Sequence, residues 1–301
     1  MIDYHRFTLE NGLDVLVHED HSSKIAVVNL LYKVGSRNER LGKTGLAHYF
    51  EHLMFGGSQH IPNFDTEVER AGGSCNAFTS PDLTNYYITL PAANIETAFW
   101  LESDRMYFLS LGEKSIETQR KVVVEEFKQR YLNQPYGDAM HHLRDEAYAQ
   151  HAYKWPTIGA QVADIEGYTR EDVAHFYAMH YRPDNAVLVV AGGVTVEEVR
   201  RLAEKWFDRK AETPFMPQVP LPEANWSGKK TKTVFADVPT DALYKAYRIA
   251  ERRSTDYLKA DLLSDMLAFG KSSLLEQQLV KNGKHFASIS AYVTGSIDPG
   301  F

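Results

Sequence analysis

The chain has 301 residues, which is enough for one large domain or two of ordinary size. Its 44% hydrophobic and 24% charged residues are typical of a globular protein, and its formal net charge of −7 gives no sign of a nucleic-acid surface. The single cysteine, Cys75, excludes an intrachain disulfide. We find no stretch long enough to span a membrane and no secretory signal. We therefore expect a cytoplasmic protein, or a periplasmic one if an exporting segment precedes this sequence.

The first part of the chain predicts strands and then one helix of special interest. Asn11-Gly12 is a tight-turn dipeptide between two alternating runs, so residues 7–18 predict a hairpin. Residues 24–34 predict a second, longer strand. After a polar loop comes the stretch 45–55, GLAHYFEHLMF, whose apolar residues recur at helical spacing.

This predicted helix carries the pattern H-x-x-E-H. His48 and His52 are four residues apart, so they project from one face about one turn apart, and two such imidazoles can bind one Zn²⁺. Glu51 is close enough to act as a general base on a water at the metal without being a ligand. The inverted order of the pattern is the signature of the inverzincin metallopeptidases. The alternative is a helix that carries two of the chain's twelve histidines by chance.

Strands are mixed with packed helices through the rest of the chain, which favours the α+β class. Further helices are predicted at about 62–71, 91–106, 115–131, 139–149, 170–180, 195–207, 256–268 and 273–282. Further strands are predicted at about 74–79, 84–90, 185–191, 231–238, 243–249 and 288–293. The proline-dense stretch 213–222 cannot be a helix or a central strand, so it predicts an extended linker.

A catalytic zinc usually has three protein ligands and one open position, so a third ligand is needed. Glu125 and Glu126, on the predicted helix 115–131, are the candidates. Adjacent helical residues point about 100° apart, so both cannot easily face one metal. Glu126 shares a helix face with Gln119 and Val122. The residues alone leave the choice open, and two solvated glutamates on a surface helix remain the alternative.

Several stretches together resemble the M16 family of zinc metallopeptidases, which includes pitrilysin, insulin-degrading enzyme and the mitochondrial processing peptidase. The likeness is greatest to the family's single-half bacterial members and spans nearly the whole chain. The stretches that carry it are HYFEH at 48–52, GGSCNAFT at 72–79, TNYY at 84–87, RKVVVEE at 120–126, PTIG at 156–159, YRPDNA at 181–186 and FGKSSLL at 269–275.

The resemblance implies roles for particular residues. Its register selects Glu126 as the third zinc ligand, beside His48 and His52. It also implies that Asn76 and Ala77 lie on a strand edge that binds an extended substrate, the alternative being an ordinary position inside a sheet. Family members often carry a second glutamate seven residues before the zinc glutamate, and Gln119 stands there. An amide can donate and accept hydrogen bonds at that position but supplies no charge.

The family fold pairs two homologous α+β domains, each an antiparallel-rich sheet packed with helices. The resemblance therefore predicts a catalytic domain at 1–212 with the HxxEH motif, a proline-rich linker at 213–228 and part of a second domain at 229–301. The ligand set implies Zn²⁺ but tolerates manganese.

We expect a zinc-dependent endopeptidase that hydrolyses peptides or small unfolded proteins, with a metal-activated water and Glu51 as general base. The expected partners are a peptide substrate and, in a homodimer or heterodimer, a second M16 subunit, with no nucleic acid and no membrane. The main alternative is a non-catalytic or partner-dependent M16 scaffold subunit. A structural zinc site is less favoured because such sites are usually closed and cysteine-rich. A serine or cysteine hydrolase has no supporting motif.

Overall fold

The computed structural model describes residues 2–211, 215–216 and 228–301. Most of the predicted linker, 213–228, therefore lies outside the described residues. By its internal contacts the chain divides between Val238 and Pro239 into two compact units, each of which is described by itself. The domain bounds given above stay a prediction.

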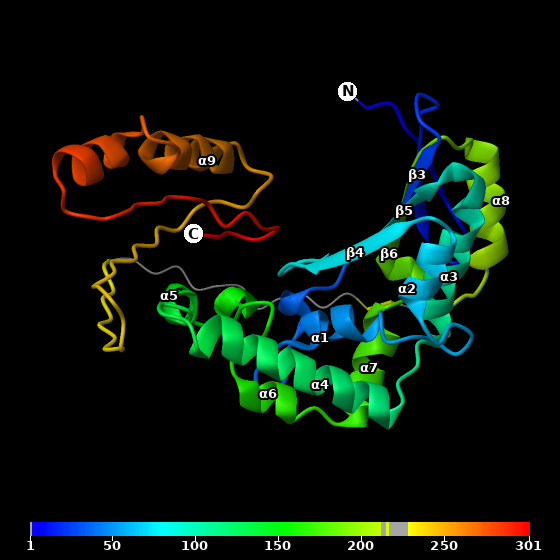
Figure 1. Cartoon of the computed structure of the whole chain (residues 1–301), viewed down its shortest axis with the longest axis horizontal. Helices are drawn as coiled ribbons and strands as arrows, with labels where there is room; N and C mark the ends of the chain where they lie inside the picture. Colours follow the sequence, from blue (N-terminus) through cyan, green and yellow to red (C-terminus); the bar gives the residue numbers. More distant parts are fainter. Residues whose placement is uncertain (1, 212–214, 217–227) are drawn as a thin grey trace. The chain divides into compact units, whose positions relative to one another are not determined.

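Six strands of the described residues form one mixed sheet in the first unit (Figure 1). Their spatial order is β1-β2-β6-β3-β5-β4, in which β2 and β6 run parallel and all other neighbours run antiparallel. The strands are β1 (His5–Thr8), β2 (Asp14–Glu19), β3 (Ile25–Tyr32), β4 (Ser74–Thr79), β5 (Thr84–Pro91) and β6 (Ala186–Gly192).

The predicted hairpin is confirmed as β1 and β2, which pair antiparallel. Gly12 in its turn has φ +90, a conformation that glycine adopts without strain. The central strand β3 alternates strictly between buried and more exposed residues, as period-2 geometry requires when one face packs on a core. β4 is the last strand of the sheet, so no strand of the described residues lies along one of its edges.

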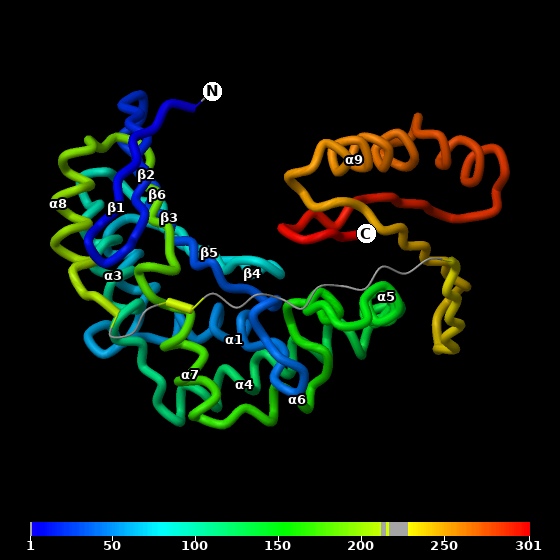
Figure 2. The backbone as a smooth tube through the Cα atoms, turned by 180° about the vertical axis from the view of Figure 1, so that it is seen from behind, coloured from blue at the N-terminus to red at the C-terminus, as the bar shows by residue number. Residues whose placement is uncertain are grey.

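The helices of the first unit pack against this sheet and against one another. They are α1 (Leu46–Leu53), α2 (Phe64–Arg70), α3 (Ile95–Phe108), α4 (Glu113–Phe127), α5 (Ala139–Ala147), α6 (Val162–Glu166), α7 (Arg170–His180) and α8 (Val196–Trp206). Both views show α1, α4, α6 and α7 grouped near one end of the sheet, and α1 contacts both β4 and α4 (Figures 1 and 2). None of the described helices has the length and apolar character needed to cross a membrane.

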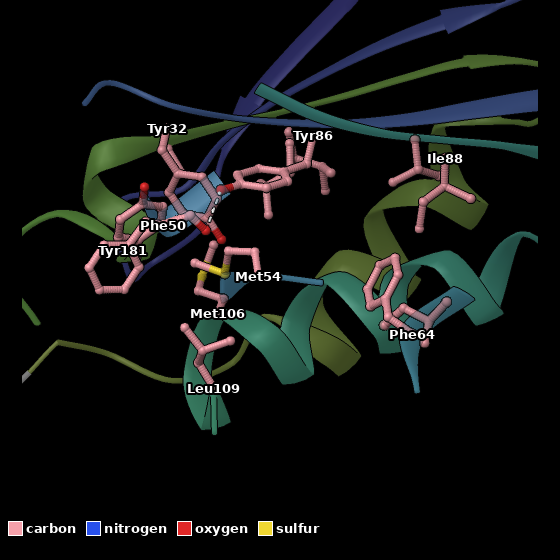
Figure 3. Packing of buried hydrophobic residues seen from close by; sticks show 14 of the residues in the cluster. Tyr32, Phe50, Met54, Phe64, Tyr86, Ile88, Met106, Leu109 and Tyr181 are labelled. Atoms are coloured by element: carbon pink, nitrogen blue, oxygen red, sulfur yellow. Dashed lines mark hydrogen bonds between the residues drawn. The ribbon is translucent and has the colours of Figure 1, made fainter. Parts of the chain in front are cut away.

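Buried aromatic residues fix α1 to the sheet (Figure 3). Phe50 of α1 stacks on Tyr181 with ring centroids 5.0 Å apart, and Tyr181 in turn lies 4.9 Å from Tyr32 of β3. Tyr86 of β5 donates a hydrogen bond of 3.4 Å to the Phe50 carbonyl. The motif helix is therefore held by the main core rather than lying loosely on the surface.

Several predicted helices begin or end at other residues than expected. α3 begins at Ile95 rather than at residue 91, because Pro91 is the last residue of β5 and Ala92–Asn94 form a 3₁₀ turn. α2 begins at Phe64 rather than Pro62, because the Asn63 side chain accepts a hydrogen bond from the Thr66 N–H and so defines the helix start. α4 ends at Phe127, and the chain continues as a π-helical turn over Lys128–Leu132.

The second unit contains α9 (Thr255–Ala268), as predicted, and a π-helical segment, Glu276–Asn282, within the predicted helix 273–282. Three predicted strands are wrong, since the stretches 231–238 at the end of the first unit and 243–249 and 288–293 in the second form no strand. A strand needs a ladder of hydrogen bonds and an apolar face that packs. Here only isolated backbone bonds form, such as Ile249 N–H to Gly300 O at 3.0 Å, and Phe235 is 95% exposed.

The mixed sheet packed with helices confirms the α+β class.

Candidate metal centre

The helix that carries the H-x-x-E-H pattern begins at a position that demands glycine. Gly45 precedes α1 with φ +93, and a Cβ there would lie 2.6 Å from the Ile158 carbonyl oxygen. On the core side α1 buries Leu46, Ala47, Tyr49, Phe50 and Leu53. The opposite face, with His48, Glu51 and His52, is thereby left for chemistry.

A buried carboxylate holds the start of α1. Glu39 accepts hydrogen bonds from the N–H groups of Gly45 (2.7 Å) and Ala47 (2.8 Å), two donors that have no partner within the helix. The Trp155 indole N–H donates to the same carboxylate at 3.0 Å. Burial raises the pKa of Glu39 to about 8, although these three donors oppose the rise.

A second contact sets the distance between α1 and α4. The Tyr49 hydroxyl donates a hydrogen bond of 2.5 Å to the Ile116 carbonyl, and Tyr49 is fully buried. On α4, Val123, Val124 and Phe127 are buried, which turns Glu126 toward α1 and Glu125 toward solvent.

The structure brings His48, His52 and Glu126 together. One Glu126 oxygen, Oε2, lies 3.3 Å from His52 Nε2 and 3.7 Å from His48 Nε2. The three potential ligand atoms lie within 4.8 Å of one another, and in the described part of the chain this is the one such group of three or more His, Cys, Asp or Glu residues. Two imidazole nitrogens and one carboxylate oxygen form a donor set that suits zinc and leaves an open position.

The protonation of these groups also suits a cation. Burial and the nearby His52 lower the pKa of His48 to about 4, so its imidazole is neutral at pH 7 and can offer a lone pair. The contact with His52 lowers the pKa of Glu126, which is therefore an anion at that pH.

Glu51 lies beside this group on the same face of α1. Its Oε2 accepts a hydrogen bond of 2.5 Å from the hydroxyl of Thr79, the last residue of β4. Burial raises the pKa of Glu51, and the Thr79 hydrogen bond opposes the rise. A carboxylate with a raised pKa is a better proton acceptor at neutral pH.

The remaining residues singled out from the sequence lie on β4 and α4, the two elements that also carry Thr79 and Glu126. Asn76 and Ala77 lie on the edge strand β4, and the Asn76 side chain accepts a hydrogen bond of 2.8 Å from the Ala77 N–H. Gln119 lies two turns before Glu126 on α4 and is half-buried. Cys75 has its pKa raised by burial to about 11, so its thiol is protonated at neutral pH and is a poor nucleophile.

Sequence reasoning missed Glu39, Tyr49 and Thr79, each of which supports the site through a contact with another element that periodicity does not reveal. It also missed Arg130, whose Nη1 lies 2.9 Å from Glu126 Oε1. Arg130 did carry a signal, because residues four apart on a helix are neighbours.

Comparisons with known proteins show the family of this chain. A family model described as Insulinase (Peptidase family M16) matches residues 14–161, which include His48, Glu51, His52 and Glu126, and a second, Peptidase M16 inactive domain, matches residues 167–301. The crystal structure of a protease from Helicobacter pylori superimposes with a TM-score of 0.91 at 31% identity, over 100% of this chain and 73% of that one. The chain therefore belongs to peptidase family M16.

Curated relatives carry names that mention zinc or a peptidase. Zinc protease PqqE of Helicobacter pylori is 36% identical over 279 residues, which make up 91% of this chain and 63% of the relative. A probable mitochondrial-processing peptidase subunit beta of Arabidopsis thaliana is 28% identical over 93% of this chain and 52% of its own length. The chain thus spans less than two thirds of these relatives. The border between the two family models, near residue 165, lies inside the first compact unit.

Proposed function

We propose that this chain is a zinc-dependent endopeptidase acting on peptides or small unfolded proteins. The observation that carries the proposal is the convergence of His48, His52 and Glu126 beside Glu51. The zinc proteases among its relatives support the same reading. Its cytoplasmic location stays a prediction.

His48 and His52 would hold the metal through Nε2, and Glu126 through one carboxylate oxygen. When bound, zinc lowers the pKa of water and polarises a carbonyl group. Glu51 takes the proton from the attacking water and passes it to the leaving amine. Thr79, by donating to one Glu51 oxygen, keeps the other oxygen available for that proton.

The edge of β4 is the proposed substrate site. An extended peptide can add to an open strand edge through main-chain hydrogen bonds, and Asn76 and Ala77 would provide part of that edge. Thr79 ends the same strand and contacts Glu51, so a peptide bound along β4 would run toward the general base. This arrangement favours extended or unfolded substrates over folded ones.

A second candidate is a partner-dependent or non-catalytic subunit. Relatives that are named as subunits of the mitochondrial-processing peptidase support it, as does the match of residues 167–301 to a model described as inactive. In that case a second M16 chain, in a heterodimer or a homodimer, would complete the site. The full set of zinc-binding side chains and the general base favour the peptidase.

A peptide-library assay tests the proposal. The protein is incubated with mixed peptides alone, with a chelator, and with the chelator followed by added zinc, and new termini are read by mass spectrometry. We expect cleavage that the chelator abolishes and zinc restores. Cleavage that resists removal of all bound metal would contradict the proposal, and zinc binding without cleavage would favour the partner-dependent subunit.

A further inference from the structure

The two oxygens of Glu126 have different partners. Oε2 faces the two histidines, at 3.3 Å from His52 Nε2 and 3.7 Å from His48 Nε2. Oε1 instead forms an ion pair with Arg130, whose Nη1 nitrogen lies 2.9 Å away. The carboxylate is thus divided between a guanidinium on one side and the candidate metal centre on the other.

Arg130 approaches this oxygen from a π-helical turn. It lies four residues after Glu126, within the π-helical turn Lys128–Leu132 that follows α4. Short π-helical turns inside or at the end of α-helices are found frequently at functional sites. Glu126 is only 18% exposed, whereas Arg130 is 66% exposed, so the arginine contacts the site from the solvent side.

The exposure of Arg130 argues against a role in holding the fold. An ion pair with one partner in solvent contributes little to stability. The same stretch of chain contains a pair of similar kind, Lys128 with Glu125 at 2.7 Å, whose carboxylate is 61% exposed and faces away from the histidines. What distinguishes Arg130 is that its partner is a candidate metal ligand.

We propose that Arg130 is a positioning residue that occupies Oε1 of Glu126 and so presents Oε2 alone to the metal. This inference rests on the proposed metal centre. A carboxylate ligand whose other oxygen is held by an ion pair loses less rotational freedom when the metal binds, which raises the affinity for the metal. The Arg130 guanidinium also repels the metal cation, but its charge is exposed to solvent and is therefore screened.

The test is the affinity for zinc ion, measured by competition with a chromophoric chelator on the metal-free chain. We expect Arg130→Gln to bind zinc about 10-fold more weakly than the wild type. Arg130→Lys, which keeps a positive charge on a side chain longer than that of glutamine, should recover much of the affinity. The matched control is Lys128→Gln, which removes the neighbouring ion pair and should bind zinc as the wild type does.

A spectroscopic measurement separates positioning from a general loss of stability. With cobalt(II) ion in place of zinc, the visible absorption reports ligand geometry, and it should change in Arg130→Gln but not in Lys128→Gln. Equal or tighter zinc binding by Arg130→Gln, with an unchanged cobalt spectrum, would overturn the inference while leaving the metal centre intact. Failure of the wild type to bind one metal ion would overturn both.

Discussion

The buried carboxylate of Glu39 gives the sharpest prediction about how the motif helix is held. In Glu39→Ala, the Trp155 indole N–H keeps a second acceptor, the Ser36 carbonyl at 3.1 Å. The N–H groups of Gly45 and Ala47, however, lose the Glu39 oxygens that accept their hydrogen bonds. A buried donor without a partner costs about 1–3 kcal/mol, so two donors cost about 2–6 kcal/mol.

A second variant grades the effect. In Glu39→Gln the amide oxygen can replace Oε2, which serves both Gly45 and Trp155, while the amide NH₂ would face the Ala47 N–H. One donor is then lost, so we expect a destabilisation of about 1–3 kcal/mol. Glu10, which is 91% exposed, offers the control, and Glu10→Ala should change stability by less than about 0.5 kcal/mol.

The assay is urea unfolding of the metal-free chain, followed by tryptophan fluorescence and circular dichroism. Trp155, one of four tryptophans, is buried beside Glu39, so part of the fluorescence change arises in this region. The account predicts the order wild type, Glu39→Gln, Glu39→Ala from most to least stable. If Glu39→Ala were as stable as Glu10→Ala, the assigned role of Glu39 at the helix start would be wrong.

Three further predictions concern other contacts of the first unit. The buried Arg105 donates a hydrogen bond of 2.7 Å from its Nε to Glu102. Glu102→Gln leaves this arginine without a counter-charge, and urea unfolding should show a loss of about 3–5 kcal/mol in the free energy of unfolding. Burial raises the pKa of Asp172, but hydrogen bonds from Lys43 and Thr169 outweigh it and hold the pKa at about 2, below the ordinary 3.8. Asp172 therefore stabilises the fold above about pH 3.8 and loses this contribution as the pH falls toward 2. Since solvent screens the interaction, Asp172→Asn should lower the free energy of unfolding by about 1 kcal/mol at pH 7 and by almost nothing at pH 2. Equal losses at both pH values would count against the ion pair. Thr79→Val should lower the rate of peptide cleavage about 10-fold or more with zinc affinity unchanged, because it frees the Glu51 carboxylate to turn, and an unaltered rate would remove Thr79 from the account.

The sequence predicted those features of the site that follow from spacing within one element. The four-residue interval predicted that His48 and His52 share a face, and their rings lie 4.8 Å apart. This inference needs only the geometry of a single helix. The residues alone left the choice between Glu125 and Glu126 open, and it was the register of the family resemblance that selected Glu126, which the structure places beside the two histidines.

Contacts between distant elements could not be predicted in this way. Thr79 meets Glu51 from a different strand, and Glu39 meets Trp155 across 116 residues of sequence. The strands expected at 231–238, 243–249 and 288–293 fail for a related reason. Strand propensity at 231–238 describes what a segment can form when a partner lies beside it, and no such ladder forms there in the described residues.

The central claim is that this chain binds one catalytic zinc and that Glu51 is the base. The measurement that tests it most directly is zinc content and peptide cleavage on the same preparation of Glu51→Gln, beside the wild type and Glu125→Gln, whose carboxylate is 61% exposed. The account predicts one zinc per chain in all three, with cleavage lost in Glu51→Gln alone. Wild-type turnover by Glu51→Gln, or the absence of zinc from the wild type, would contradict it.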